Sequence, residues 1–247
     1  MKLLGINYTN VTLTDALAIA LTSLTNNKKS NIYFLNSDCL LKTQHDQEYC
    51  NIINPTNLIL PDGVGIRFAT WLFGGKMKGN CNGTDFSPLL MKKAAEKGYK
   101  IFFLGAKEGI AQKAAENVKK SIPGIHIVGT HSGYLNNDEE AVKMINDSQA
   151  DILFVAMGVP IQEKWIARNR DKLSPRLCLG VGALFDYLSG NSPRAPKIIR
   201  ILYLEWLWRV IVEPKRLFKR YLVDGVGFFC WLVGYRIKQL ITGEKTS

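Results

Sequence analysis

Short apolar runs alternate with helical patterns along most of this chain. One polar helical pattern follows Asp38, and the others cover residues 65–73, 86–97, 109–121, 137–147 and 161–172. Strands that alternate with helices of this length predict parallel βαβ units, and so an α/β fold with a Rossmann-like, mostly parallel sheet and flanking helices. The ligand crevice is then expected at the carboxyl ends of the strands. The six predicted strands are residues 31–36, 57–60, 100–105, 125–129, 151–158 and 176–182.

The composition indicates a globular protein that works without a metal or other cofactor. The chain has 247 residues, of which 47% are hydrophobic and 21% charged, enough for one α/β domain with a small annex. Five cysteines form no CxxC pair and only three histidines occur, which argues for a reduced, cytoplasmic protein without a structural zinc site. No DxD pair or histidine cluster suggests metal ligation, and the N-terminus has no apolar core of the kind found in signal peptides.

The stretch NLILPDGVGI, residues 57–66, places a carboxylate directly after a predicted strand. Such a position is where sheets of this class bind ligands, and the neighbouring glycines permit close approach of a ligand to the backbone. Asp is also a common N-cap residue, so Asp62 could instead cap a helix that begins near Val64. The local sequence leaves both interpretations open.

Other predicted strand ends carry groups suited to a nucleotide. Gly105 and Gly158 open turns whose free N–H groups could meet phosphate, although no GxGxxG pattern occurs. Gln162 can both donate and accept hydrogen bonds, Asp186 adds a carboxylate, and Tyr134 could pack on a base. Each of these residues alone has an ordinary structural explanation. Their expected convergence on one edge of the sheet suggests a binding site.

The last 57 residues differ from the rest of the chain. Residues 191–247 contain eleven Lys and Arg against four Asp and Glu, a difference of +7 out of the total of +11. We expect them to form a basic amphipathic helical appendage to an α/β core of residues 1–190, docked on an anionic membrane surface. One alternative is a helical pair that packs on the core or forms a homo-oligomer contact, and another is nucleic-acid binding, which the many aliphatic residues disfavour.

The aromatic residues of this appendage are expected to enter the lipid. Its longest uncharged run, residues 225–235, is about half of what a membrane-spanning helix needs. The appendage is therefore expected to lie at the membrane interface rather than cross it. The side chains expected to enter the lipid are Trp206, Trp208, Phe228, Phe229 and Trp231.

Several segments together resemble one family, the WecG/TagA/CpsF bacterial glycosyltransferases (glycosyltransferase family 26). These segments include PDGVGI, GTDF, LGAKEG, THSGYL, GVPIQEKW, VGALFDYLSGNSPRAP and LEWLWRVIVEPKRLFKRYL, and the similarity extends to about Tyr221. The resemblance implies an inverting, metal-independent enzyme that works peripherally at the inner face of the cell membrane. It would move a sugar from a UDP-sugar to an undecaprenyl-diphosphate-linked sugar in teichoic acid or exopolysaccharide synthesis. N-acetylmannosamine is the expected sugar, and glucose, galactose or a uronic acid are the alternatives.

The resemblance also assigns roles to individual residues. Asp62 matches the proposed catalytic base, Asn36 an asparagine that holds sugar hydroxyls, and Gln162 the glutamine of a PxQE motif. In the tail, three residues match a basic set that would neutralise the diphosphate of the leaving group. These three residues are Arg209, Arg216 and Lys219.

Two positions depart from the family pattern. Members usually have Thr two residues before the asparagine, where this chain has Phe34, and Arg at the position of Asn80. Losing a hydroxyl and a guanidinium from a sugar pocket is expected to change which sugar is held.

Two rival functions have a basis in the sequence. A noncatalytic module could bind a sugar nucleotide or a lipid diphosphate at the membrane surface without turnover. A nicotinamide-dependent oxidoreductase would share the βαβ pattern but should carry the GxGxxG fingerprint, which is absent.

Overall fold

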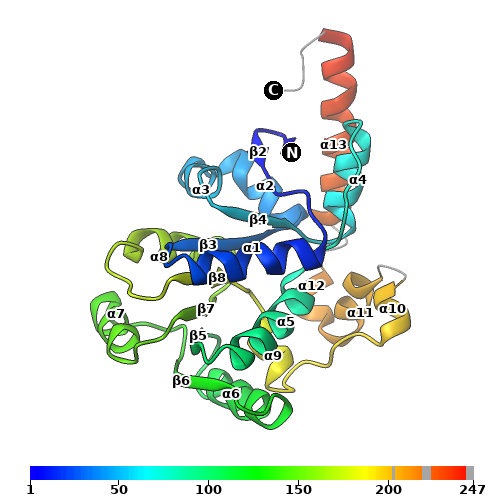
Figure 1. Cartoon of the computed structure of the whole chain (residues 1–247). Helices are drawn as coiled ribbons and strands as arrows, with labels where there is room; N and C mark the ends of the chain where they lie inside the picture. The colour runs from blue at the N-terminus through cyan, green and yellow to red at the C-terminus, as the bar shows by residue number, and fades with distance from the viewer. Residues whose placement is uncertain (202–203, 219–223, 243–247) are drawn as a thin grey trace.

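A six-stranded parallel sheet forms the centre of the molecule, and all six predicted strands are confirmed (Figure 1). The computed structural model describes residues 1–201, 204–218 and 224–242. Buried aliphatic and aromatic residues dominate five of the six strands, as expected for a sheet covered on both faces, whereas the edge strand at residues 126–131 has only Ile127 buried. The strands are β3 (Ser30–Leu35), β4 (Leu58–Pro61), β5 (Lys100–Gly105), β6 (His126–His131), β7 (Ile152–Ala156) and β8 (Leu177–Gly180).

Six of the helices that link these strands match the predicted ones, whereas the short helices at residues 47–53 and 184–188 were not predicted. Within the core they are α2 (Ser37–His45), α3 (Gln47–Ile53), α4 (Val64–Leu72), α5 (Gly83–Glu96), α6 (Ile110–Ser121), α7 (Asp138–Asp147), α8 (Ile161–Asn169) and α9 (Leu184–Leu188). Towards the C-terminus lie α10 (Lys197–Ile201), α11 (Glu205–Val212), α12 (Pro214–Phe218) and α13 (Asp224–Thr242).

The N-terminal elements did not appear among the predicted ones. A short antiparallel pair, β1 (Lys2–Leu3) and β2 (Ile6–Asn7), precedes α1 (Leu13–Thr25). Helix α1 begins with a capping box, in which the Thr12 side chain accepts from the Asp15 N–H and the Asp15 side chain accepts from the Thr12 N–H. The T-x-x-D spacing before an apolar run was the signal that could have located it.

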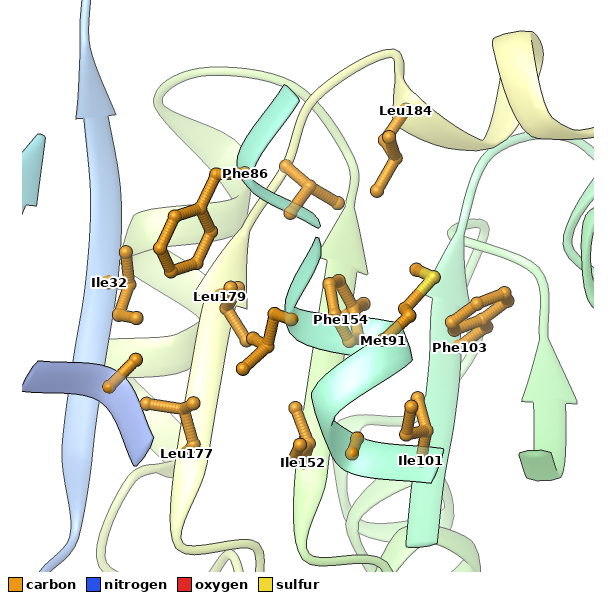
Figure 2. Close-up of a cluster of buried hydrophobic side chains, with 14 of the residues drawn as sticks. Ile32, Phe86, Met91, Ile101, Phe103, Ile152, Phe154, Leu177, Leu179 and Leu184 are labelled. Carbon is orange, nitrogen blue, oxygen red and sulfur yellow. The ribbon is translucent and has the colours of Figure 1, made fainter. Parts of the chain in front are cut away.

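Helices cover both faces of the sheet. On one face, α1, α5, α6 and α9 pack on alternate strand residues, and Figure 2 shows Met91 of α5 beside Phe103 and Phe154. On the other face, α2, α3, α4, α7 and α8 form a second core with the intervening strand residues. Within the described residues, this three-layer arrangement confirms the predicted α/β class.

The strand order β4-β3-β8-β7-β5-β6 sets the position of the crevice. The neighbouring strands β3 and β8 lead into helices on opposite faces, since α2 belongs to one core and α9 to the other. Diverging connections of this kind open a crevice at the carboxyl edge of a parallel sheet.

The packing of helix α13 corrects the expectation that Phe228 and Phe229 enter lipid. Phe228 and Leu232 are 1% and 0% exposed and belong to the second core, where α13 contacts α2 and α4 (Figure 1). Phe229 packs edge-on against Phe68 of α4, with ring centroids 5.1 Å apart. An apolar face at helical spacing can meet either lipid or protein, and here α13 turns it towards the core. Across the described parts of the chain, no helix has the length and apolar character to cross a bilayer.

Candidate active site

Asn36 and Asp62 lie side by side at the carboxyl edge of the sheet. The parallel register pairs Leu35 of β3 with Pro61 of β4, so each polar residue comes directly after a paired strand residue. The Asp62 N–H donates to the Leu35 carbonyl at 2.8 Å, which extends the ladder to this point. The two residues therefore come together where these neighbouring strands end.

The turn after Asp62 is held from a distant segment. Gly63 has a φ of +90°, a conformation that favours glycine, and its N–H donates to the Asn80 side-chain oxygen at 2.8 Å. The Cys81 N–H donates to the Pro61 carbonyl at 2.9 Å. Gly63, rather than Asp62, is the N-cap residue of α4, so the helix-cap interpretation of Asp62 is not the arrangement found.

Asn36 stabilises the start of a helix and also lines the candidate site. It is the N-cap residue of α2, and its side-chain oxygen accepts from the Cys39 N–H at 3.0 Å. This bond fixes the orientation of the amide, because the oxygen is committed to the helix. The amide nitrogen is then the atom that could donate to a ligand hydroxyl.

Both residues line a cavity of about 390 Å³, and this volume is typical of small-molecule sites. One side of it comes from the ends of β3 and β4, the start of α4 and the segment 80–84. The C-terminal helices supply further lining residues. The residues that line it are Asn36, Ser37, Asp38, Leu41, Asp62, Gly63, Val64, Gly65, Asn80, Asn82, Thr84, Arg200, Glu205, Trp206, Arg209, Gly225, Val226, Phe228 and Phe229.

Two arginines, Arg200 and Arg209, bring positive charge to this cavity. Arg209 was predicted from the sequence; it donates to Glu205 at 3.3 Å and lies over the Tyr187 ring at 5.1 Å from the centroid. Arg200 was missed, because its position depends on how α10 docks. Of the other predicted cations, Arg216 has its backbone in α12 but its side chain is outside the description, and Lys219 lies outside the described residues.

Gln162 does not line this cavity, although the resemblance placed it in the active site. Its side chain is 2% exposed, and its oxygen accepts from the N–H groups of Gly158 at 3.2 Å and Gly182 at 2.9 Å. Its amide nitrogen donates to Glu163 at 2.7 Å. In this structure Gln162 therefore ties the loop after β7 to the loop after β8.

Glu163, which accepts the hydrogen bond from the Gln162 amide, is a buried carboxyl group. It is 1% exposed, and burial raises its pKa to about 7, with the Gln162 hydrogen bond opposing the rise. Its second oxygen has no hydrogen-bond partner among the described residues. A carboxyl in this setting is stabilised in its protonated form at moderately acid pH.

The remaining predicted nucleotide-binding residues lie along the strand ends beyond the cavity. Gly105 is required by close packing, because a Cβ there would lie 2.5 Å from the Ala156 carbonyl oxygen. Tyr134 is 72% exposed, in a loop whose Gly133 N–H donates to the Ala106 carbonyl at 2.9 Å. Asp186, in α9, accepts from the Asn191 side chain at 3.4 Å. The structure therefore divides the predicted residues between the cavity and a neighbouring row of loops.

The two departures from the family pattern have different surroundings. Phe34 is 8% exposed, belongs to the core cluster that includes Phe86, and lies under Gly83, where a Cβ would come within 3.3 Å of its ring. It does not line the cavity, so its effect on a bound sugar can only be indirect. Asn80 does line the cavity and also holds the Gly63 turn.

Charged and polar groups beyond the predicted set complete the cavity wall. The missed residues include Asn82 and Thr84, in the GTDF region, and Arg200. Asn82 caps α5 by accepting from the Asp85 N–H at 2.8 Å, and N-x-x-D before a helix was the available signal. Among the described residues, no three His, Cys, Asp or Glu side chains are grouped so as to hold a metal ion.

Comparison with known proteins identifies the family. The model of the WecG/TagA/CpsF glycosyl transferase family matches residues 1–241. An N-acetylglucosaminyldiphosphoundecaprenol N-acetyl-beta-D-mannosaminyltransferase of Bacillus spizizenii is 33% identical over 195 residues, covering 79% of this chain and 76% of that protein. A Staphylococcus aureus (strain MRSA252) protein of the same name is 28% identical over 220 residues, covering 88% and 86%. The chain belongs to the WecG/TagA/CpsF family of glycosyltransferases.

Proposed function

We propose that this glycosyltransferase moves an N-acetylmannosamine-type sugar from a UDP-sugar to an undecaprenyl-diphosphate-linked sugar. The observation that carries the proposal is that Asp62 and Asn36, at the ends of neighbouring strands, line the same cavity as two arginines. The names of the relatives give the acceptor, a diphosphoundecaprenol-linked N-acetylglucosamine, and the transferred sugar. The UDP carrier rests on the family resemblance.

Asp62 would act as the general base. Its carboxylate accepts the proton of the attacking acceptor hydroxyl as the hydroxyl oxygen bonds to the anomeric carbon of the donor. The bond from that carbon to the diphosphate oxygen breaks with its electron pair, so UDP leaves and the configuration inverts. Asn36, whose oxygen is held by α2, would donate from its amide nitrogen to a sugar hydroxyl.

Positive charge near the cavity would stabilise the leaving diphosphate. Negative charge develops on UDP as the glycosidic bond breaks, and preorganised cations lower the energy of that transition state. Arg209 lines the cavity and is our candidate, together with Arg216 and Lys219 from the sequence resemblance. We propose that Gly105, Tyr134, Gly158 and Asp186 form the neighbouring surface for the nucleotide, and that Gln162 acts by holding its loops.

The enzyme would reach its lipid-linked acceptor from the inner membrane surface as a peripheral protein. Ile237, Leu240 and Ile241 of α13 are 52%, 68% and 80% exposed, and Trp71 of the neighbouring α4 is 66% exposed. Figure 1 shows the end of α13 projecting beyond the sheet. Exposed apolar side chains beside a strongly basic tail suit an anionic interface. A homo-oligomer remains a prediction from the sequence.

The proposal is tested with a panel of UDP-sugars and a soluble diphosphate-linked N-acetylglucosamine acceptor. We expect UDP-N-acetylmannosamine to give a product heavier by one N-acetylhexosamine, measured by mass spectrometry. A product formed only with UDP-glucose, UDP-galactose or a UDP-uronic acid would keep the chemistry and change the donor. Binding of UDP without a product from any donor would favour the noncatalytic module.

Replacing Asp62 by Asn tests the base. Asp62→Asn keeps the size of the side chain and is expected to lower turnover by roughly a hundredfold or more, with UDP affinity little changed. The matched control is Asp147→Asn, which removes an exposed carboxylate paired with Lys143 on α7. Turnover of Asp62→Asn within a few-fold of the parent would exclude the role of general base.

A further inference from the structure

Arg200 and Arg209 contribute differently to the cavity they share. The Arg209 guanidinium is engaged by Glu205, itself a lining residue, at 3.3 Å and by the face of Tyr187. Among the described residues, the carboxylate nearest to Arg200 is that of Asp85, 3.5 Å from Nη1. The charge of Arg200 is therefore the less compensated of the two.

Asp85 is already occupied by closer partners. One of its oxygens pairs with Arg194, and the other accepts from the Asn82 amide at 2.7 Å. A single carboxylate shared by two guanidinium groups leaves one net positive charge. Arg194 makes the shorter contact, so we assign that surplus to Arg200 at the cavity wall.

The Arg200 side chain is anchored while part of it remains available. Its Nε donates to the Ala195 carbonyl at 3.1 Å, which fixes the plane of the guanidinium. Nη2 makes no hydrogen bond with the described part of the protein, and 31% of the side chain is exposed. A planar, fixed guanidinium with unused donors is suited to phosphate, which it can bind through two parallel hydrogen bonds.

We propose that Arg200 is a diphosphate-binding residue of this cavity and that Asp85 positions it. This inference rests on the proposed function, because a diphosphate is the anion that the donor and the acceptor both carry. The ligand is either the diphosphate of UDP or that of the lipid-linked acceptor, and Arg200 recognises the chemistry that they share. The cavity then presents a base at the ends of β3 and β4 and a cation from α10.

The test compares Arg200→Gln and Arg200→Lys with the parent enzyme. Gln removes the charge and Lys keeps it without the planar fork. The control is Arg168→Gln, which removes an arginine of 60% exposure that pairs with Asp138 on the far helices. Circular dichroism and the midpoint of thermal unfolding show whether each variant keeps its fold.

UDP and UMP affinities, measured by calorimetry, form the first arm, and the KM for a soluble diphosphate acceptor analogue forms the second. If Arg200 binds the donor, Arg200→Gln should weaken UDP binding about tenfold or more and UMP binding much less, with Lys intermediate. If it binds the acceptor, the KM of the analogue should rise by a similar factor at unchanged UDP affinity. Arg168→Gln should change neither.

Two outcomes would overturn the inference, and they differ from failure of the proposed function. UDP affinity and acceptor KM both within twofold of the parent would reduce Arg200 to a structural partner of Asp85. Equal loss of UDP and UMP affinity, with a lowered unfolding midpoint, would show a general disturbance of the site. If the parent itself neither binds UDP nor transfers any sugar, the proposed function fails first.

Discussion

Leu232→Ala tests whether α13 belongs to the folded core. Leu232 is 0% exposed and packs in the second core cluster with α2 and α4. Replacing a fully buried leucine by alanine costs about 3 to 5 kcal/mol of unfolding free energy, since transfer energy is lost and a cavity remains. Leu240→Ala is the matched control, because it makes the same change on the same helix at 68% exposure and should cost less than about 0.5 kcal/mol.

The assay is urea unfolding followed by far-UV circular dichroism, with the slope of each transition checked for change. We expect the Leu232→Ala midpoint to fall well below that of Leu240→Ala at equal slope. A difference under 1 kcal/mol between the two variants would show that α13 detaches without affecting the core. The division into residues 1–190 and 191–247, a prediction from the sequence, would then describe two independent folding units.

Two other predictions concern Glu163 and Gly105, which do not line the cavity. The pKa of Glu163 is about 7 in the folded protein and 4.5, its ordinary value, in the unfolded chain. Between these two pH values the folded state binds more protons, so the free energy of unfolding should fall as the pH rises. This difference amounts to on the order of 3 kcal/mol of unfolding free energy, and Glu163→Gln should remove most of it. The measurement is urea unfolding of both proteins at pH 5 and pH 7.5. An unchanged pH dependence in the variant would contradict the assignment. Gly105→Ala should destabilise severely, since its Cβ would lie 2.5 Å from the Ala156 oxygen, whereas Gly227→Ala, with open space around it, should be neutral or stabilising by about 0.5 to 1 kcal/mol. Comparable unfolding midpoints for these two glycine variants would refute the packing argument.

The fold could be predicted from the sequence because each local pattern agrees with the final structure. The strand runs carry apolar residues on both faces, and the intervening helices have clear starts and ends. Helix α1 was not among the predicted helices although its capping box was readable, because no apolar run long enough to predict a strand precedes it. The two-residue strands β1 and β2 are too short to leave a periodic signal.

The site could be predicted only where strand ends define it. Asn36 and Asp62 follow neighbouring parallel strands, so the sequence positions alone imply that they meet. Arg200 gave no such signal, because its place in the cavity depends on the docking of α10 rather than on the sheet. The aromatic face of α13 was read as lipid-facing for a related reason: periodicity shows that a helix has an apolar face but not what covers that face.

Phe228 belongs both to the second core and to the wall of the cavity. It is 1% exposed within the second core, its ring lies about 3.5 Å from the place where a Gly65 side chain would begin, and it also lines the cavity. The tail is therefore held at the site by the apolar packing of α13 and by the pairing of Arg194 with Asp85. A wall attached in two ways, one apolar and one ionic, keeps its arginines in place before any ligand arrives. If these arginines bind the diphosphate as proposed, such preorganisation would lower the reorganisation that a charged transition state otherwise requires.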